Sequence, residues 1–239
     1  MKGRIIRVPS NYDADRRTYT GTWDGTFKTA YSNNPAWVFY DILTNDRYGL
    51  GDVLDAGYID KWSLYEIGQY CDESVPTGVG STTEPRFTCN CYLQSAADAT
   101  AVLSDLATVF RGIVYWGNGS AIPVADMPRD PSYTYTAANV IDGKFQYQGS
   151  ARSTRYTVCY VSYNDPDDMY NTKVEAVEDA DGIARYGIVA TSITAFACSS
   201  RSQAHRLGLW TLLTSQRETR SVTFSVGLDG AIATPGQII

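Results

Sequence analysis

Residues 95–124, SAADATAVLSDLATVFRGIVYWGNGSAIPV, decide the fold. Their first part places apolar side chains at positions i, i+3, i+4 and i+7, the spacing of one buried helix face. The members of this stripe are Ala99, Val102, Leu103, Leu106, Val109 and Phe110. Ser95 is the expected N-cap, with Asp98 three residues later, and Gly112 follows the stripe. Two short strands around Asn118-Gly119 then form a hairpin, which makes this stretch an α+β unit.

On the N-terminal side of this stretch, the pattern predicts two more helices. Asn34 is a good N-cap and Pro35 suits the first helical position. We expect helices at 34–45 and 60–72, a loop at 74–85 and a strand at 86–93. Residues 1–33 contain Pro, Gly, Asn and Asp at short intervals and no long periodicity. We therefore expect them to form an extended arm that packs on something else.

The C-terminal half is predicted to be richer in strands. We expect strands near 144–148, 155–163, 171–177, 186–189 and 221–228. A long helix is expected to begin at Ser200, where Gln203 completes a capping box, and to end near Glu218. Pro235-Gly236 followed by Ile238-Ile239 is typical of a turn that opens another strand, so we expect the chain to be cut there from a longer protein.

The expected fold is therefore α+β, with two mixed units of antiparallel or mixed sheet and packed helices behind an extended N-terminal arm. We expect the arm at 1–33, an α+β domain at 34–133, and a β-rich domain with one long helix at 134–239. The last domain is expected to be truncated at its C-terminal end.

The composition limits the classes of partner. Of the 239 residues, 44% are hydrophobic and 19% charged, which indicates a folded chain rather than a disordered one. The formal net charge is −6, from 26 acidic and 20 basic residues, and the basic residues are scattered along the sequence. Nucleic acids and anionic membranes require clustered Lys and Arg. We therefore expect no direct nucleic-acid binding.

The sequence offers few residues for catalysis or metal binding. His205 is the single histidine, so every mechanism that needs histidine depends on it, and a hydrogen-bonding structural role is favoured. Five cysteines occur without a CxxC motif: Cys71, Cys89, Cys91, Cys159 and Cys198. We expect them to be reduced and mostly buried. We predict no catalytic, cofactor-binding or metal-binding residues and no cofactor.

Two patterns leave a glycan-binding or glycan-hydrolysing module open as an alternative. Asp165, Asp167 and Asp168 crowd one segment, and residues 178–182 form a second acidic segment. Either segment is compatible with ion binding, although both are typical of solvated turns. Aromatic side chains could stack on sugars, although core and subunit-interface packing is favoured for them. The candidates are Tyr65, Tyr70, Trp116, Tyr133 and Tyr135.

A set of motifs in a fixed order resembles the tail tip protein J family, the host specificity proteins of lambda-like tailed phages. The motifs are VPSNYD (8–13), YTGTWDG (19–25), NPAWV (34–38), DIL (41–43), RYG (47–49), YCDE (70–73), QAHR (203–206), VTFSVGL (222–228) and PG (235–236). Each motif is weak alone, but the ordered set is specific and covers nearly the whole chain.

The resemblance implies a structural role and no catalysis. Family members form a trimeric hub at the distal tip of a long non-contractile tail, and this chain matches the hub portion. The implied partners are further copies of the protein and other tail tip and tail tube proteins. The resemblance implies that the host outer-membrane receptor is contacted only through other regions of the full-length protein. It further implies location at the virion tail tip after assembly in the bacterial host cytoplasm, where reduced cysteines persist.

Overall fold

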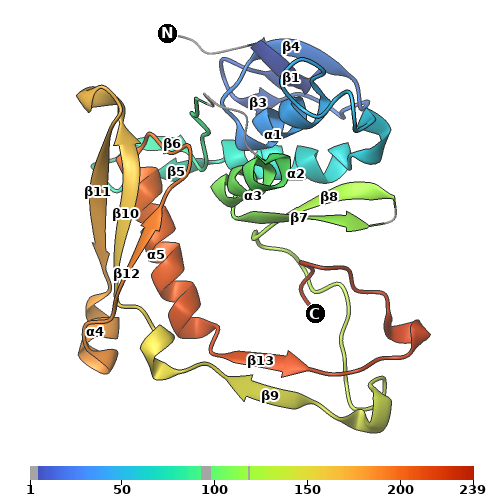
Figure 1. Cartoon of the computed structure of the whole chain (residues 1–239), viewed down its shortest axis with the longest axis vertical. Coiled ribbons are helices and arrows are strands. Elements are labelled where there is room, and N and C mark those ends of the chain that lie inside the picture. Colours follow the sequence, from blue (N-terminus) through green and yellow to red (C-terminus); the bar gives the residue numbers. More distant parts are fainter. Residues whose placement is uncertain (1–4, 93–97, 118) are drawn as a thin grey trace. The chain divides into compact units, whose positions relative to one another are not determined.

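The computed structural model describes residues 5–92, 98–117 and 119–239 (Figure 1). These residues form α-helices and several small sheets, which confirms the expected α+β class. The chain divides into two compact units. Unit 1 comprises Met1–Met127, Asn164–Asn171 and Phe196–Gln203, and unit 2 comprises Pro128–Tyr163, Thr172–Ala195 and Ala204–Ile239. Strands β10 (Val158–Asp165) and β11 (Asn171–Glu178) and helix α5 (Arg201–Arg217) contribute residues to both units.

Unit 1 is built on three helices with small two-stranded sheets around them. Its helices are α1 (Pro35–Thr44), α2 (Lys61–Asp72) and α3 (Ala99–Val109), with the short 3-10 helix η1 (Ala56–Tyr58). Its strands are β1 (Ile5–Pro9), β2 (Tyr12–Asp13), β3 (Thr18–Tyr19), β4 (Phe27–Tyr31), β5 (Ser74–Pro76), β6 (Thr83–Pro85), β7 (Gly112–Gly117) and β8 (Ser120–Ala125). The pairs are β1 with β4, β2 with β3, β5 with β6 and β7 with β8.

The three helices begin where side chains satisfy their first backbone N–H groups. The Asn34 side chain accepts from the backbone N–H of Ala36, and the Asp60 side chain accepts from two N–H groups of α2. Asp98, not Ser95, caps α3, and Ser95 lies outside the described residues. The helices bury one core, whose largest fully buried members include Trp37, Phe39, Leu64, Ile67, Leu106 and Phe110.

The expected N-terminal arm is instead part of the core of unit 1. Strand β1 pairs antiparallel with β4, so the segment folds back on itself. Ile6 and Val8 are buried while Ile5 is exposed, an alternation that gives β1 one core-facing side. Tyr12 and Trp23 are buried as well. The sequence did not predict strand β1 because the strand is only five residues long, which is too short for the alternation of apolar and polar side chains to be recognised.

Residues 74–93 also differ from expectation. The expected loop at 74–85 contains the β5–β6 hairpin, whose turn uses Gly78 and Gly80 at positive φ. The expected strand at 86–93 does not form across 86–92. The backbone N–H groups of Phe87, Cys89 and Asn90 donate to three separate neighbours, so no ladder develops.

Unit 2 combines a three-stranded sheet, a long helix and a two-stranded ribbon. Its strands are β9 (Gln146–Gly149), β10, β11, β12 (Ala190–Thr194) and β13 (Arg220–Thr223), and its helices are α4 (Ala180–Tyr186) and α5. Its 3-10 helices are η2 (Ile141–Gly143), η3 (Arg152–Thr154) and η5 (Leu228–Gly230). The 3-10 helix η4 (Pro166–Asp168), which links β10 to β11, belongs to unit 1. The sheet order is β11-β10-β12, with β10 and β12 parallel, and β13 pairs antiparallel with β9.

Helix α5 packs on this sheet through a glycine (Figure 1). A Cβ atom at Gly208 would lie 2.7 Å from Cγ2 of Val177 and 2.9 Å from Cγ2 of Val161. The missing side chain therefore lets the helix backbone approach β10 and β11. Leu212, one turn later, is fully buried.

Two expectations for the C-terminal half were wrong. Residues 186–189 are not a strand, because α4 extends to Tyr186 and Gly187 follows at φ 82°, so the strand begins at Ala190. The strand expected at 221–228 ends at Thr223, which pairs with Gln146, the first residue of β9. Pro235-Gly236 forms a turn, as expected.

Candidate interaction surfaces

The most polar buried site in unit 1 centres on Asp72 at the end of α2. Its carboxylate accepts from Nη2 of Arg17 at 2.6 Å, from the Tyr19 hydroxyl at 2.9 Å and from Nδ2 of Asn34 at 2.7 Å. The Asp72 side chain is only 3% exposed. Burial raises the pKa of this carboxyl, while the guanidinium of Arg17 opposes the shift. This network ties the N-terminal segment to α1 and α2 and is structural.

The five aromatic candidates do not form one surface. Tyr65 stacks on Trp23 with ring centroids 4.8 Å apart, at the edge of the unit 1 core. Tyr70 lies against Phe87, 6.2 Å away. Trp116 is 62% exposed and lies 6.3 Å from Tyr58. These contacts involve different elements, and they favour packing over a shared sugar platform.

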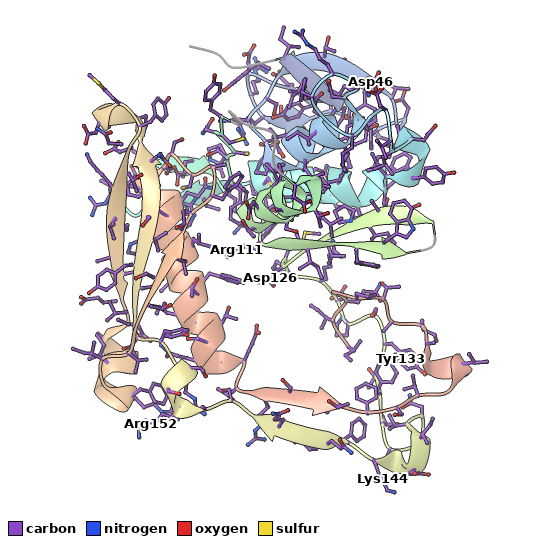
Figure 2. The ribbon with its side chains drawn as sticks, in the orientation of Figure 1. Asp46, Arg111, Asp126, Tyr133, Lys144 and Arg152 are labelled. Carbon is purple, nitrogen blue, oxygen red and sulfur yellow. The ribbon has the colours of Figure 1, made fainter. Side chains whose placement is uncertain are left out.

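Tyr133 and Tyr135 are the two aromatic candidates that meet. Their ring centroids lie 4.8 Å apart, and Tyr135 lies 4.8 Å from Phe224, which contacts Phe145. Figure 2 labels Tyr133, which lies in unit 2. The cluster fixes the segment that follows β13, because Phe224 is the next residue after the strand ends.

The two acidic segments have different structures. Asp165, Asp167 and Asp168 form the tip between β10 and β11, as the turn interpretation predicts, and Asp165 Oδ1 accepts from the Asp167 N–H. Residues 178–182 are not a turn, because α4 begins at Ala180 with Asp179 at its N-cap position. Among the described residues, no group of three or more His, Cys, Asp or Glu is placed to hold a metal ion.

His205 has a structural partner. Its Nδ1 lies 3.0 Å from Oε1 of Glu175 on β11, within unit 2. Half of the His205 side chain is exposed, whereas the Glu175 side chain is largely buried. Gln203 supports the start of α5 as expected, since its N–H donates to Oγ of Ser200. Its side chain does not complete the capping box, because it bonds to the Thr88 backbone and hydroxyl instead.

All five cysteines are free, and only Cys91 is exposed. The hydrogen bond from Cys89 lowers the pKa of Cys91 to about 7 and raises that of Cys89. Burial raises the pKa of Cys71 well above its ordinary value. The pattern fits the expectation of reduced, mostly buried thiols.

No other element of the described chain covers the β9–β13 ribbon, a feature that the strand prediction did not include. Every residue of both strands is exposed. Tyr147 and Val222 lie directly opposite each other on this ribbon and are 68% and 43% exposed. A two-stranded ribbon is marginally stable alone in water, so this one is suited to being covered by a partner.

Sequence reasoning also missed an arginine cluster in unit 2. The guanidinium carbons of Arg152, Arg155 and Arg185 lie 5.9, 5.4 and 5.1 Å from the ring centroid of Tyr186. Arg152 is the first residue of η3, Arg155 follows that 3-10 helix directly, and Arg185 lies in the last turn of α4. The only signal in the sequence was the three-residue spacing of the first two. The third comes from a distant segment that the fold brings close.

Comparison with known sequences gives the class of the protein. Residues 98–239 match the sequence family described as "Putative phage tail protein". This match covers more than half of the chain, so the chain belongs to that phage tail family. Among the described residues, no helix has the length and apolar composition needed to cross a bilayer.

Two relatives narrow the comparison. The chain is 49% identical over all 239 residues to Tip attachment protein J of Escherichia phage SECphi27. It is 40% identical over all 239 residues to Tip attachment protein J of Escherichia phage SECphi4. These relatives confirm the resemblance to the tail tip protein J family. The chain spans about a fifth of the length of each.

Proposed function

We propose that this chain is part of a trimeric hub at the distal tip of a long non-contractile phage tail, where it supports host attachment and DNA passage. The observation that carries the proposal is the similarity of all 239 residues to two proteins named Tip attachment protein J. In this role the chain catalyses no reaction. It contacts further copies of itself and other tail tip and tail tube proteins, and the host receptor is bound by other regions.

The structure supports a scaffold role in two ways. A buried charged network and an aromatic-rich core stabilise unit 1, which suits a part of a scaffold. Exposed apolar groups on the β9–β13 ribbon, and Trp116 on β7, suit contacts with neighbouring proteins. We infer that these surfaces are covered in the assembled tail.

The charge of the chain is compatible with DNA passage. With a net charge of −6, the chain repels a polyanion on average. If the chain lines the channel of the hub, its negative charge lets DNA pass without binding to the wall. Free thiols are compatible with assembly in the bacterial cytoplasm, followed by location at the virion tail tip.

The structure does not favour the alternative of a glycan-binding or glycan-hydrolysing module. The candidate aromatic side chains pack on different elements, and the acidic segment at 178–182 is largely the start of a helix. The remaining acidic residues form a hairpin tip whose carboxylates engage in local hydrogen bonds.

The trimer is tested by measuring the mass of the purified full-length tip protein that carries this segment. Light scattering and native mass spectrometry should both give three copies. A monomer at micromolar concentration, or a tight dimer, would contradict the trimeric hub.

A further inference from the structure

The arginine cluster of unit 2, Arg152, Arg155 and Arg185, is the surface feature that the scaffold role does not explain. All three guanidinium groups lie within 6 Å of the Tyr186 ring centroid. Nη2 of Arg152 donates to the Arg185 carbonyl at 3.2 Å, which holds the two residues together. Like charges that gather on one ring repel each other, so the cluster is electrostatically unbalanced in isolation.

No carboxylate within the described residues forms an ion pair with any of these arginines. Asp179 and Asp181 flank the start of the same short helix as Arg185 but do not pair with it. Nε of Arg155 is buried and has no hydrogen-bond partner. Arg152 and Arg185 are exposed, and apart from the Arg152 Nη2 bond to the Arg185 carbonyl no hydrogen bond engages their guanidinium groups among the described residues. The cluster therefore has donors and charge to offer to an external anion.

The chemistry of the cluster selects a carboxylate on a protein. Guanidinium groups bind carboxylates in a bidentate geometry, and Arg and Tyr are enriched at the centres of protein interfaces. A nucleic acid is disfavoured, since three arginines do not form an extended basic stripe and the chain carries a net charge of −6.

We propose that the cluster binds the acidic β10–β11 tip, residues 165–168, of a second copy of this chain. Asp167 and Asp168 are exposed at this tip, and the next residue, Met169, is 91% exposed. The tip is therefore a protruding acidic group that complements the cluster in charge. In the sequence, strand β10 separates Arg155 from the tip, and the cluster belongs to unit 2 whereas the tip belongs to unit 1.

Such a contact joins two different surfaces of the same chain. A contact of this kind is heterologous, and it forms a closed ring when the rotation from one copy to the next closes. The inference rests on the proposed self-association, and it names the charge pair that contributes to it. It also predicts that association weakens as salt concentration rises.

The test is a charge exchange in the full-length protein, with the dissociation constant of the oligomer measured by sedimentation. Arg185→Glu and Asp167→Lys should each raise that constant by about tenfold or more, since like charges placed opposite each other in an interface disfavour association. Combining both changes in one chain should restore the constant to within about threefold of wild type. Arg185→Gln, which removes charge without reversing it, should give a smaller loss.

Lys144→Glu is the matched control, because it makes the same change of charge at an exposed side chain of unit 2. Figure 2 shows Lys144 well apart from Arg152. Its side chain is 78% exposed. The control should leave the dissociation constant unchanged, and thermal melts should confirm that every variant folds.

The outcomes separate this inference from the proposed function. A wild-type oligomer that Arg185→Glu leaves equally tight would overturn the docking contact and leave the trimer standing. Loss with Arg185→Glu but not with Asp167→Lys would overturn the second copy as the occupant and point to another acidic partner. A wild-type protein that does not associate would overturn both.

Discussion

At the scale of single residues, the ion pair between Arg17 and Asp72 has the clearest energetic role. Because the Asp72 carboxylate is almost fully buried, removal of its cation leaves an uncompensated buried charge. We expect Arg17→Met to lower the free energy of unfolding by about 3 kcal/mol. Arg16→Met, at the exposed neighbouring position, should change it by less than about 0.5 kcal/mol. Urea unfolding of the two variants decides this, and equal effects would contradict it.

Asp72 should also give stability a specific pH dependence. Its pKa is raised above 3.8 by burial, so the native state holds this proton to higher pH than the unfolded state does. The contribution of Asp72 to stability is therefore complete below 3.8 and is lost as pH rises through the raised pKa. The difference in unfolding free energy between wild type and Asp72→Asn should fall across that range. A difference that grows with pH would show that the ionised form is the favoured one.

The cysteines should differ sharply in reactivity. Cys91 is exposed and its pKa is lowered to about 7 by the hydrogen bond from Cys89, so a large fraction is thiolate at neutral pH. We expect alkylation with iodoacetamide to modify Cys91 first, with a rate that rises through about pH 7. Peptide mass spectrometry locates the label. Early modification of Cys71 or Cys198 would contradict the burial of those thiols.

At the scale of elements, α5 depends on a glycine where it meets the sheet of unit 2. A methyl group at Gly208 would lie under 3.0 Å from side chains of Val177 and Val161, which β-branched packing holds in place. We expect Gly208→Ala to destabilise the chain by about 1–3 kcal/mol despite the better helix propensity of alanine. Gly149→Ala, where the nearest atom is 3.9 Å away, is the control and should be nearly neutral. A stabilised Gly208→Ala variant would mean that the helix can move outward freely.

Helix positions were predictable from the sequence because their signals are local. The caps Asn34 and Asp60 and the apolar stripe of α3 determine each helix within a few residues. The hairpin of β7 and β8 was predictable for the same reason. Strands that depend on distant partners were not, as the end of β13 shows, since it stops where β9 has no further residue to pair.

The candidate surfaces were harder to predict than the helices. The sequence names Trp116 as an aromatic candidate. It does not predict the neighbour Tyr58, because a contact between separate elements brings the two rings together. Arg185 joins Arg152 only after the chain has passed through two strands. Contacts between residues far apart in the sequence depend on the tertiary fold, so local sequence patterns do not predict them.

At the scale of the whole molecule, membership of the phage tail family and full-chain similarity to two tip attachment proteins support the proposed hub role. The rigid core of unit 1 and the uncovered ribbon of unit 2 are what a part of a larger assembly requires. We therefore expect variants to change the stability of the chain and its contacts with neighbouring proteins.

The most direct measurement of this role is immunogold electron microscopy of tailed particles from an induced lysate, with antibody raised against this chain. We expect gold label confined to the distal tip of the tail. Particles without the segment serve as the negative control. Unlabelled tails, with the antigen recovered in the soluble fraction, would contradict the assignment of this chain to the tail tip.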